Sequence, residues 1–139
     1  MRSLTIAITD EDIRPEQILL EMKRPEVGAI VSFLGTVKGV AEDGEVEAMT
    51  VESYEEMALQ TMERREREAR EKFGVIDVAL VHRVGRLKPT DNIVLIAVSS
   101  AHRQEAFDAC RWLLEEVKMT APLWKKEHTP GGDRWVEER

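Results

Sequence analysis

Residues 93–119 read IVLIAVSSAHRQEAFDACRWLLEEVKM, and the hydrophobic period changes in the middle of this stretch. The run 93–99 is apolar and rich in β-branched side chains, which is typical of a buried strand. From about His102 to Met119 the apolar residues recur at helical spacing and predict a helix with one face on the core. These residues are Ala106, Cys110, Leu113, Leu114 and Val117. A strand followed at once by a long amphipathic helix predicts a fold that mixes α and β structure.

The chain before this stretch changes its period several times in the same way. Strand-like runs lie at 4–8, 28–38, 49–54 and 75–84, and helical patterns lie at 15–23 and 55–73. Gly35 interrupts the second run, as a bulge or the close approach of another backbone would require. Residues 39–47 contain two glycines and little apolar content, so we expect a mobile loop there. Residues 85–92 predict turns, and we expect the runs on either side of them to lie in one sheet.

Composition limits the classes of protein that the chain can belong to. Its 139 residues, 42% of them hydrophobic, fit one domain over 1–139 with a real core. A net charge of −7 argues against binding to nucleic acid or to an anionic membrane. The first ten residues hold too short an apolar run for a signal peptide or a membrane span, so we expect a cytoplasmic protein.

Metal and thiol chemistry have little support in the sequence. Cys110 is the single cysteine, which excludes an internal disulfide and a metal site built from several cysteines. Histidines and acids are not at metal-ligand spacing, so we expect no protein-bound metal. Because Cys110 lies on the apolar stripe of its helix, we interpret it as a buried, unreactive thiol rather than a nucleophile.

Basic residues gather at both ends of the predicted helix 102–119. His102 and Arg103 fall in its first turn, where a cation is unfavourable because it lies at the positive end of the helix dipole. Their presence there makes sense if an anion also binds the free backbone N–H groups. Lys118 falls in the last turn, where a cation is favourable in any helix. The residues after the helix make Lys118 a stronger candidate for a binding site, since Trp124 and two lysines directly after Trp124 follow the helix. A large aromatic side chain close to several lysines can bind a flat anionic ligand.

Other polar features have simpler explanations. Residues 64–68, RRERE, are interpreted as a solvated helix face with neighbouring opposite charges rather than a binding patch. His82 and His128 are interpreted as a strand histidine and a surface histidine.

Five short motifs follow one another along the chain. They are FLGTVK at 33–38, HRVG at 82–85, SSAHR at 99–103, Lys118 with APLWKKE at 121–127, and GDRWV at 132–136. In this order and at this spacing they resemble the family of large, catalytic subunits of molybdopterin synthase, over nearly the whole chain. The resemblance implies an α+β protein, an α/β hammerhead fold with an additional antiparallel β-sheet subdomain.

The resemblance also implies a sulfurtransferase of molybdenum cofactor biosynthesis. In that family a small ubiquitin-like carrier subunit ending in Gly-Gly bears a C-terminal thiocarboxylate, which enters a pocket of the large subunit. Two sulfurs pass to cyclic pyranopterin monophosphate and form the dithiolene of molybdopterin, and molybdenum enters later. The large subunits form a central homodimer with one carrier at each end, a heterotetramer, and hold no permanent cofactor. Sulfur supplied from outside agrees with a chain whose only thiol lies on a core stripe.

Residue roles follow from the same resemblance. Lys118 and Lys125 match the active-site lysines, and each could stabilise the oxyanion formed at the thiocarboxylate carbonyl or move protons. The positions that match the substrate site are Thr36, Val37, Lys38, His102, Arg103, Lys126 and Glu127, with His102 and Arg103 reaching the pocket from the neighbouring subunit. The positions expected to contact the carrier tail or the substrate are Phe33, Arg134 and Arg139. The family usually has arginine in place of Lys38, and lysine lacks the bidentate fork of arginine.

The residues by themselves leave other functions open. A non-catalytic pterin- or nucleotide-binding module would also use His102, Arg103 and Lys125 to hold an anion. It would need neither two lysines at one reacting carbon nor a groove for the tail of another protein. An interaction scaffold built on the charged helix at 55–72 would not depend on Lys118 or Lys125.

Overall fold

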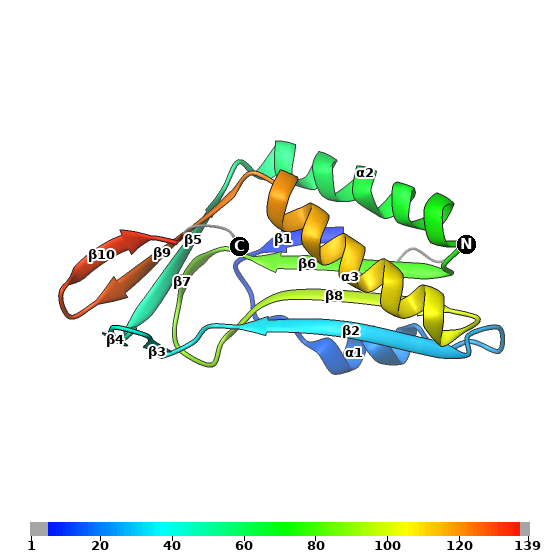
Figure 1. Ribbon diagram of the computed structural model, residues 1–139, viewed down its shortest axis with the longest axis horizontal. Coiled ribbons are helices and arrows are strands. Elements are labelled where there is room, and N and C mark those ends of the chain that lie inside the picture. Colours follow the sequence, from blue (N-terminus) through cyan, green and yellow to red (C-terminus); the bar gives the residue numbers. More distant parts are fainter. Residues whose placement is uncertain (1–5, 137–139) are drawn as a thin grey trace.

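The computed structural model describes residues 6–136, and this part of the chain forms three helices and ten strands (Figure 1). The helices are α1 (Pro15–Glu21), α2 (Glu55–Phe73) and α3 (Arg103–Thr120). The strands are β1 (Ile6–Thr9), β2 (Ala29–Thr36), β3 (Val40–Ala41), β4 (Gly44–Glu45), β5 (Ala48–Ser53), β6 (Asp77–Arg83), β7 (Gly85–Leu87), β8 (Asn92–Ser100), β9 (Leu123–Thr129) and β10 (Gly132–Trp135). All three predicted helices are confirmed, with ends that differ by at most two residues.

The main sheet has the strand order β1-β6-β8-β2, in which only β1 and β6 run parallel. Helices α2 and α3 cover one face and α1 covers the other (Figure 1). Leu80 of β6 packs in the cluster that includes Leu113 of α3, whereas its neighbour Ala79 packs with Met22 just after α1. Because both faces are covered, β6 and β8 are apolar almost throughout and alternate between two cores. The two runs on either side of residues 85–92 are paired, as we expected.

Local sequence explains where the helices begin and end. Pro15 occupies the first position of α1, where its fixed φ suits a helix and its missing N–H costs nothing. Gly74 closes α2 in the left-handed conformation, with φ 68°. Ala121 ends α3 in an extended conformation, and Pro122 follows it. None of the helices in the described residues is of a length and apolar character that would let it traverse a lipid bilayer.

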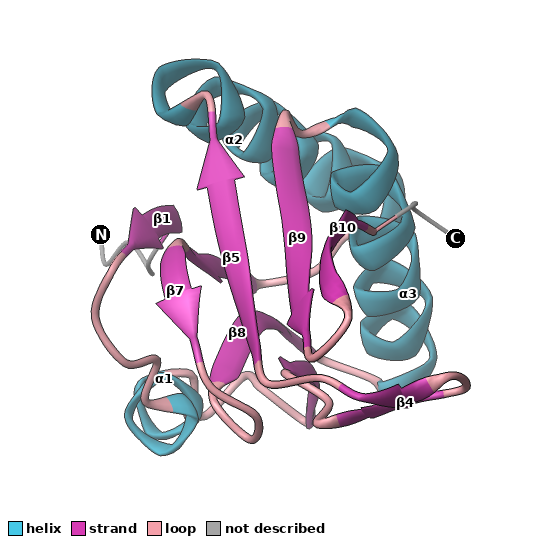
Figure 2. Ribbon diagram, turned by 90° about the vertical axis from the view of Figure 1, so that its left-hand side faces the viewer, coloured by secondary structure: helices cyan, strands magenta, loops and turns pink. Residues whose placement is uncertain are grey.

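The second sheet has the order β10-β9-β5-β7 and is antiparallel throughout. It lies at one end of the main sheet, and Figure 2 shows its strands side by side. This sheet is the additional antiparallel subdomain that the family resemblance implied. Of its strands, sequence periodicity had indicated only β5.

The prediction of a mobile loop at 39–47 is wrong, because the segment contains the short hairpin β3–β4. Gly44 forms its turn with φ 135°, which favours glycine. Val46 just after the hairpin is buried. The guanidinium of Arg134 forms a double contact with the carboxylate of Asp43 and so ties the hairpin to β10. Polar composition hid this segment, since few apolar residues mark it.

The expected irregularity at Gly35 is confirmed. The register between β2 and β8 shifts between Gly35 and Thr36. A Cβ at Gly35 would lie 2.8 Å from Cγ1 of Val94, so the two strands approach closely there. The shift occurs at the end of β2 that borders the cavity described next.

Candidate active site

The two predicted catalytic lysines line one cavity of about 220 Å³, although they come from different elements. Lys118 lies in the last turn of α3 and Lys125 lies in β9. Thr36 at the end of β2 and His82 near the end of β6 complete the polar part of the lining. The other described residues around the cavity are apolar side chains and one glycine. In such low-polarity surroundings a positive charge acts more strongly on a nearby anion than it does in water.

The turn between α3 and β9 brings the lysines together. The backbone N–H of Ala121 donates to Val117 at 3.0 Å, and the chain then passes directly into β9 (Figure 1). The N–H of Tyr54 donates to the carbonyl oxygen of Pro122 at 3.1 Å, which fixes the turn against the end of β5. Val51 of β5 pairs with Lys125. The position of Lys125 therefore depends on strand pairing between residues more than 70 positions apart.

His82 is a cavity residue to which the sequence analysis gave no functional role. Only 3% of it is exposed, and its Nδ1 lies 2.9 Å from the carbonyl oxygen of Arg83. Burial lowers the pKa of His82 to about 4, and the positive charge of Lys125 also lowers this pKa. The imidazole is therefore neutral at pH 7. The sequence did contain one signal that His82 faces inward. His82 lies in the apolar run 75–84, on the same strand face as Leu80 two residues earlier.

The predicted site residues of the motif 33–38 lie in three different environments. Phe33 and Thr36 line the cavity. Val37 is buried in the core, and its backbone exchanges hydrogen bonds with the loop at 90–91. Lys38 is exposed and does not line the cavity. The side chains of this motif therefore divide between the cavity, the core and the surface.

His102 and Arg103 lie at the opposite end of α3 from Lys118. Arg103 and Lys118 are fifteen positions apart in α3, a distance of roughly 22 Å along the helix axis. The side chain of His102 is 82% exposed. Within one chain the structure therefore does not bring this pair to the cavity.

An anion from the chain itself already occupies part of this helix start. Glu105 lies in the first turn of α3 and accepts a hydrogen bond from the hydroxyl of Ser100 at 3.0 Å. A hydrogen bond to its own backbone N–H, together with the one from Ser100, lowers the pKa of Glu105. The favourable end of the dipole is thus used by a carboxylate, with His102 at 3.8 Å from it.

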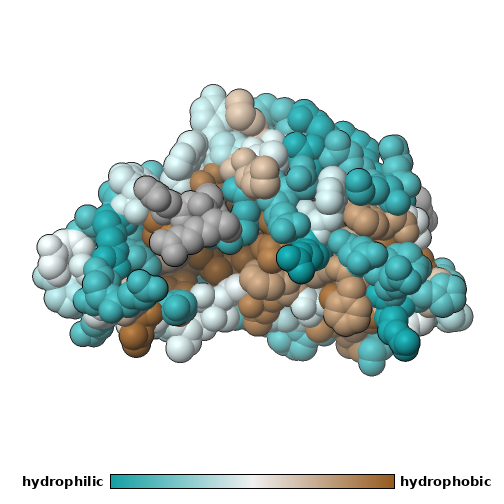
Figure 3. All heavy atoms as spheres, viewed as in Figure 1, coloured by the Kyte–Doolittle hydropathy of each residue, from teal (hydrophilic) through white to brown (hydrophobic). Residues whose placement is uncertain are grey.

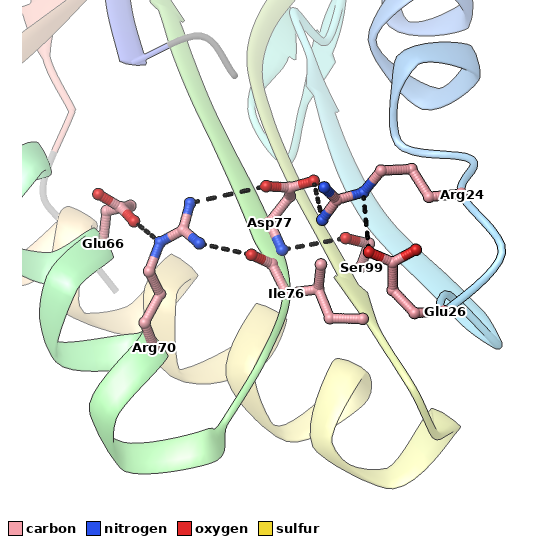
Figure 4. Close-up of polar contacts among 7 residues, drawn as sticks. All are labelled: Arg24, Glu26, Glu66, Arg70, Ile76, Asp77 and Ser99. Carbon is pink, nitrogen blue, oxygen red and sulfur yellow. Dashed lines mark hydrogen bonds and ion pairs between the residues drawn. The ribbon is translucent and has the colours of Figure 1, made fainter. Parts of the chain in front are cut away.

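A charged cluster lies where β6 begins and β8 ends (Figure 4). Asp77 is buried, and its carboxylate lies 3.1 Å from Arg24 and 3.9 Å from Arg70. Its backbone N–H donates to the hydroxyl of Ser99 at 3.0 Å. Each arginine also contacts a glutamate, as Figure 4 shows. The cluster links α2, the loop after α1 and the end of β8, from which residues 101–103 continue.

The predicted residues of β9 and β10 pair with each other. Lys126 is on the opposite face of β9 from Lys125, and its Nζ lies 4.6 Å from the ring centre of Trp135. Glu127 accepts a hydrogen bond from Arg134 at 2.9 Å. Asp43 and Glu127 raise the pKa of Arg134, so its charge is kept and is balanced by two carboxylates. Arg139 lies outside the described residues.

A larger, open groove of about 810 Å³ runs beside the cavity between β2 and α3. Phe33, Leu114 and Lys118 line both spaces. Phe107 and Met119 border the groove and are 61% and 76% exposed. Figure 3 shows apolar side chains at the surface on this side of the molecule. Apolar side chains gathered at a surface are typical of a protein–protein contact.

Cys110 is buried, and burial raises its pKa to about 11, which agrees with an unreactive thiol. Within residues 6–136 no group of three or more His, Cys, Asp or Glu side chains is placed to hold a metal ion.

Comparison with known proteins assigns this fold to a class, the molybdopterin synthases. Molybdopterin synthase from Staphylococcus aureus has the same fold, with a TM-score of 0.90, 33% identity and 99% of each chain covered. A chain from a complex of subunits 1 and 2 of the molybdopterin-converting factor of Helicobacter pylori shares the fold, with a TM-score of 0.78 and 20% identity, over 96% of this chain and 90% of that one.

The family follows from two sequence matches. The model of the family described as MoaE protein matches residues 8–120. The molybdopterin synthase catalytic subunit of Ralstonia nicotianae is 40% identical over 139 residues, which is all of this chain and 79% of that protein. The chain belongs to the MoaE family. The resemblance inferred from the five motifs is thereby confirmed.

Proposed function

We propose that this chain is the catalytic subunit of a cytoplasmic molybdopterin synthase. It transfers sulfur from the C-terminal thiocarboxylate of a small ubiquitin-like carrier ending in Gly-Gly to cyclic pyranopterin monophosphate, and so forms the molybdopterin dithiolene. It holds no permanent cofactor, because sulfur arrives on the carrier. One observation carries the proposal: in a member of the MoaE family, Lys118 and Lys125 line one mostly apolar cavity.

Two ammonium groups in this cavity suit the charge that sulfur transfer creates. The thiocarboxylate sulfur first adds to an electrophilic carbon of the substrate, and the electron pair of the carbon–oxygen bond broken there passes to oxygen, which takes a proton. The carrier is then attached to the substrate as a thioester. Water then attacks the thioester carbon and forms a tetrahedral oxyanion, which collapses with cleavage of the C–S bond, leaves sulfur on the substrate and frees the carrier as a carboxylate. Lys118 or Lys125 would stabilise this oxyanion, and the other would transfer protons.

The surroundings of the cavity fit two protein partners. The open groove between β2 and α3, which apolar and charged side chains line together, adjoins the cavity and shares Lys118 with it, so a carrier seated there could pass its tail inward. His102 and Arg103 are too far from the cavity of their own chain to act in it. They would serve the cavity of a second copy in a homodimer, which with two carriers gives a heterotetramer.

A reconstituted reaction tests the proposal. The protein is mixed with a thiocarboxylated Gly-Gly carrier and cyclic pyranopterin monophosphate, and product is detected as an oxidised fluorescent derivative. Lys118→Ala and Lys125→Ala should each keep the fold and carrier binding but lower turnover about 100-fold, the cost of one missing oxyanion contact. Lys23→Ala, an exposed position on the α1 side, is the matched control and should not change turnover.

Two outcomes would count against this assignment. Full turnover in both lysine variants would remove Lys118 and Lys125 from the chemistry. A carrier that binds the wild-type protein but yields no product would favour the non-catalytic pterin-binding module. In that case Lys38→Arg is the first substitution to make, because it supplies the guanidinium usual at that position.

A further inference from the structure

Among the described residues that line the cavity, His82 is the one buried polar side chain for which the lysine chemistry above supplies no role. It lies near the end of β6, is 3% exposed and lines the cavity with Lys118 and Lys125. Residues of β6 alternate between the two faces of the main sheet, and His82 is on the same face as Leu80, toward α3. The fold therefore holds this imidazole firmly at the inner side of the cavity.

The hydrogen bond at Nδ1 determines which ring nitrogen can act in the cavity. Nδ1 lies 2.9 Å from the carbonyl oxygen of Arg83, and a carbonyl oxygen can only accept. Nδ1 must therefore carry the hydrogen and donate it. Because burial and the charge of Lys125 lower the pKa of His82 to about 4, the ring holds no second proton. Nε2 is left with its lone pair as a hydrogen-bond acceptor.

Few of the described side chains that line this cavity can accept a hydrogen bond. The ammonium groups of Lys118 and Lys125 only donate, and the hydroxyl of Thr36 can do either. Among the described lining side chains, His82 supplies the nitrogen acceptor. An N–H group that enters mostly apolar surroundings loses its hydrogen bonds to water, and a ligand bearing such a group is bound well only if an acceptor replaces them.

We propose that His82 is a ligand-orienting residue whose Nε2 accepts a hydrogen bond from an N–H group of the molecule that enters the cavity. The proposal rests on the proposed function, which supplies two sources of that group. One is a peptide N–H of the Gly-Gly tail, and the other is a ring or amino N–H of the pterin. The chemistry is the same for both, and the experiment distinguishes them.

Two amide substitutions separate the two ring nitrogens. The amide of asparagine is as many bonds from Cβ as Nδ1 is, so His82→Asn can keep the bond to Arg83 while it loses the acceptor at the Nε2 position. The amide of glutamine is at the distance of Nε2, so His82→Gln keeps an acceptor there. We expect His82→Asn to lose roughly 30-fold in kcat/KM and His82→Gln to stay within about 5-fold of the wild type, since an unpaired N–H in the complex is costly.

Binding measurements identify the source of the N–H group. If it belongs to the tail, His82→Asn weakens binding of the carrier measured by calorimetry. If it belongs to the pterin, carrier binding is unchanged and KM for the pterin rises. His128→Asn is the control, because His128 lies in β9 between Thr50 and Asp133, does not line the cavity, and should leave all three quantities unchanged.

A purely structural role for His82 gives the opposite order, with His82→Asn more active than His82→Gln. That order, or full activity in both variants, overturns the proposal. Should both variants fail to fold, ¹⁵N NMR of the wild-type imidazole still decides, because the signal of unprotonated Nε2 must move when carrier or pterin is added. An unmoved signal at saturation overturns the proposal. A wild-type protein that gives no product refutes the proposed function instead, whereas the NMR signal reports on His82 alone.

Discussion

Gly28→Ala is a small change that should disturb the start of α3 from a distance in sequence. Gly28 precedes β2, and its N–H donates to the carbonyl oxygen of Ser100 at 2.9 Å. A Cβ at position 28 would lie 2.2 Å from the carbonyl oxygen of Ala101. Carbon–oxygen contacts normally begin at about 3.3 Å, so one backbone segment must move by roughly 1 Å. The obstacle is backbone, which cannot rotate away as a side chain does.

The expected loss of stability follows from two terms. Forcing an extra carbon into a packed site costs about 1–3 kcal/mol. Weakening the hydrogen bond from Gly28 to Ser100 adds about 1 kcal/mol. With an unfolding entropy of roughly 2 cal/mol/K per residue, a loss of about 2–4 kcal/mol lowers Tm by about 7–14 °C.

The same movement should reach the basic pair that follows Ala101. A displacement of about 1 Å at a substrate-positioning group can cost as much as 100-fold in rate. At a temperature below the Tm of the variant, we therefore expect Gly28→Ala to raise KM for the pterin or to lower kcat/KM by more than 10-fold, because His102 and Arg103 are displaced.

Thermal unfolding at one protein concentration and the reconstituted reaction check these effects. Gly131→Ala is the matched control, since its Cβ would have Thr129 Oγ1 at 3.9 Å as nearest neighbour. If Gly28→Ala had the same Tm as Gly131→Ala, the close approach of residue 28 to Ala101 would be refuted. A lower Tm with unchanged kinetics would show that the turn at 99–103 does not position substrate.

Two further predictions concern buried titratable groups. The pKa of His82 is about 4 in the folded chain and near 6.5 in the unfolded chain. As pH falls, the unfolded chain therefore binds a proton at His82 before the folded chain does. The free energy of unfolding is then highest above about pH 6.5 and falls by about 3 kcal/mol in all as pH drops toward 4. Urea unfolding at pH 7 and pH 4.5 should show this loss, and His82→Gln should reduce it; an equal loss in the variant would assign it to other groups. Burial raises the pKa of Cys110 to about 11, so iodoacetamide should label the native protein far more slowly than the denatured one at pH 8, and equal rates would contradict an inert thiol.

Local patterns made the helices and the central strands predictable. A helix is defined by spacing within a few turns, so apolar stripes, Pro15 and Gly74 were enough to place α1, α2 and α3. Strands β6 and β8 are buried on both faces and consist of continuous apolar runs that are visible in any window of the sequence. These signals do not depend on distant partners.

The second sheet was hidden for the opposite reason. Strand β9 carries charged side chains on both faces, with Lys125 toward the cavity and Lys126 toward Trp135, so apolar alternation never appears. What makes it a strand is pairing with β5, a segment more than 70 residues earlier. The hairpin β3–β4 is similar, since the contact between Asp43 and Arg134 spans 91 positions.

The site shows the same division between local and distant information. Motifs along the chain indicated Lys118 and Lys125 one by one, but their meeting in one cavity depends on the α3–β9 turn and on the β5–β9 register. His82 was missed because it ends an apolar strand, where a histidine looks like any satisfied core residue. Its place in the cavity becomes visible only when the neighbouring element, β9, brings the charge of Lys125 near it.

The length of α3 also constrains how the two basic clusters can cooperate. Helix geometry fixes Arg103 and Lys118 roughly 22 Å apart on one rigid element, and no rotation of side chains closes that gap. Arg103 does not line the cavity that contains Lys118 of the same chain. If both clusters act on one substrate, each copy must complete the cavity of a neighbour, with one end of α3 serving its own cavity and the other end serving its partner's. The spacing of two motifs in the sequence thus sets a requirement on assembly that the fold of one chain cannot meet.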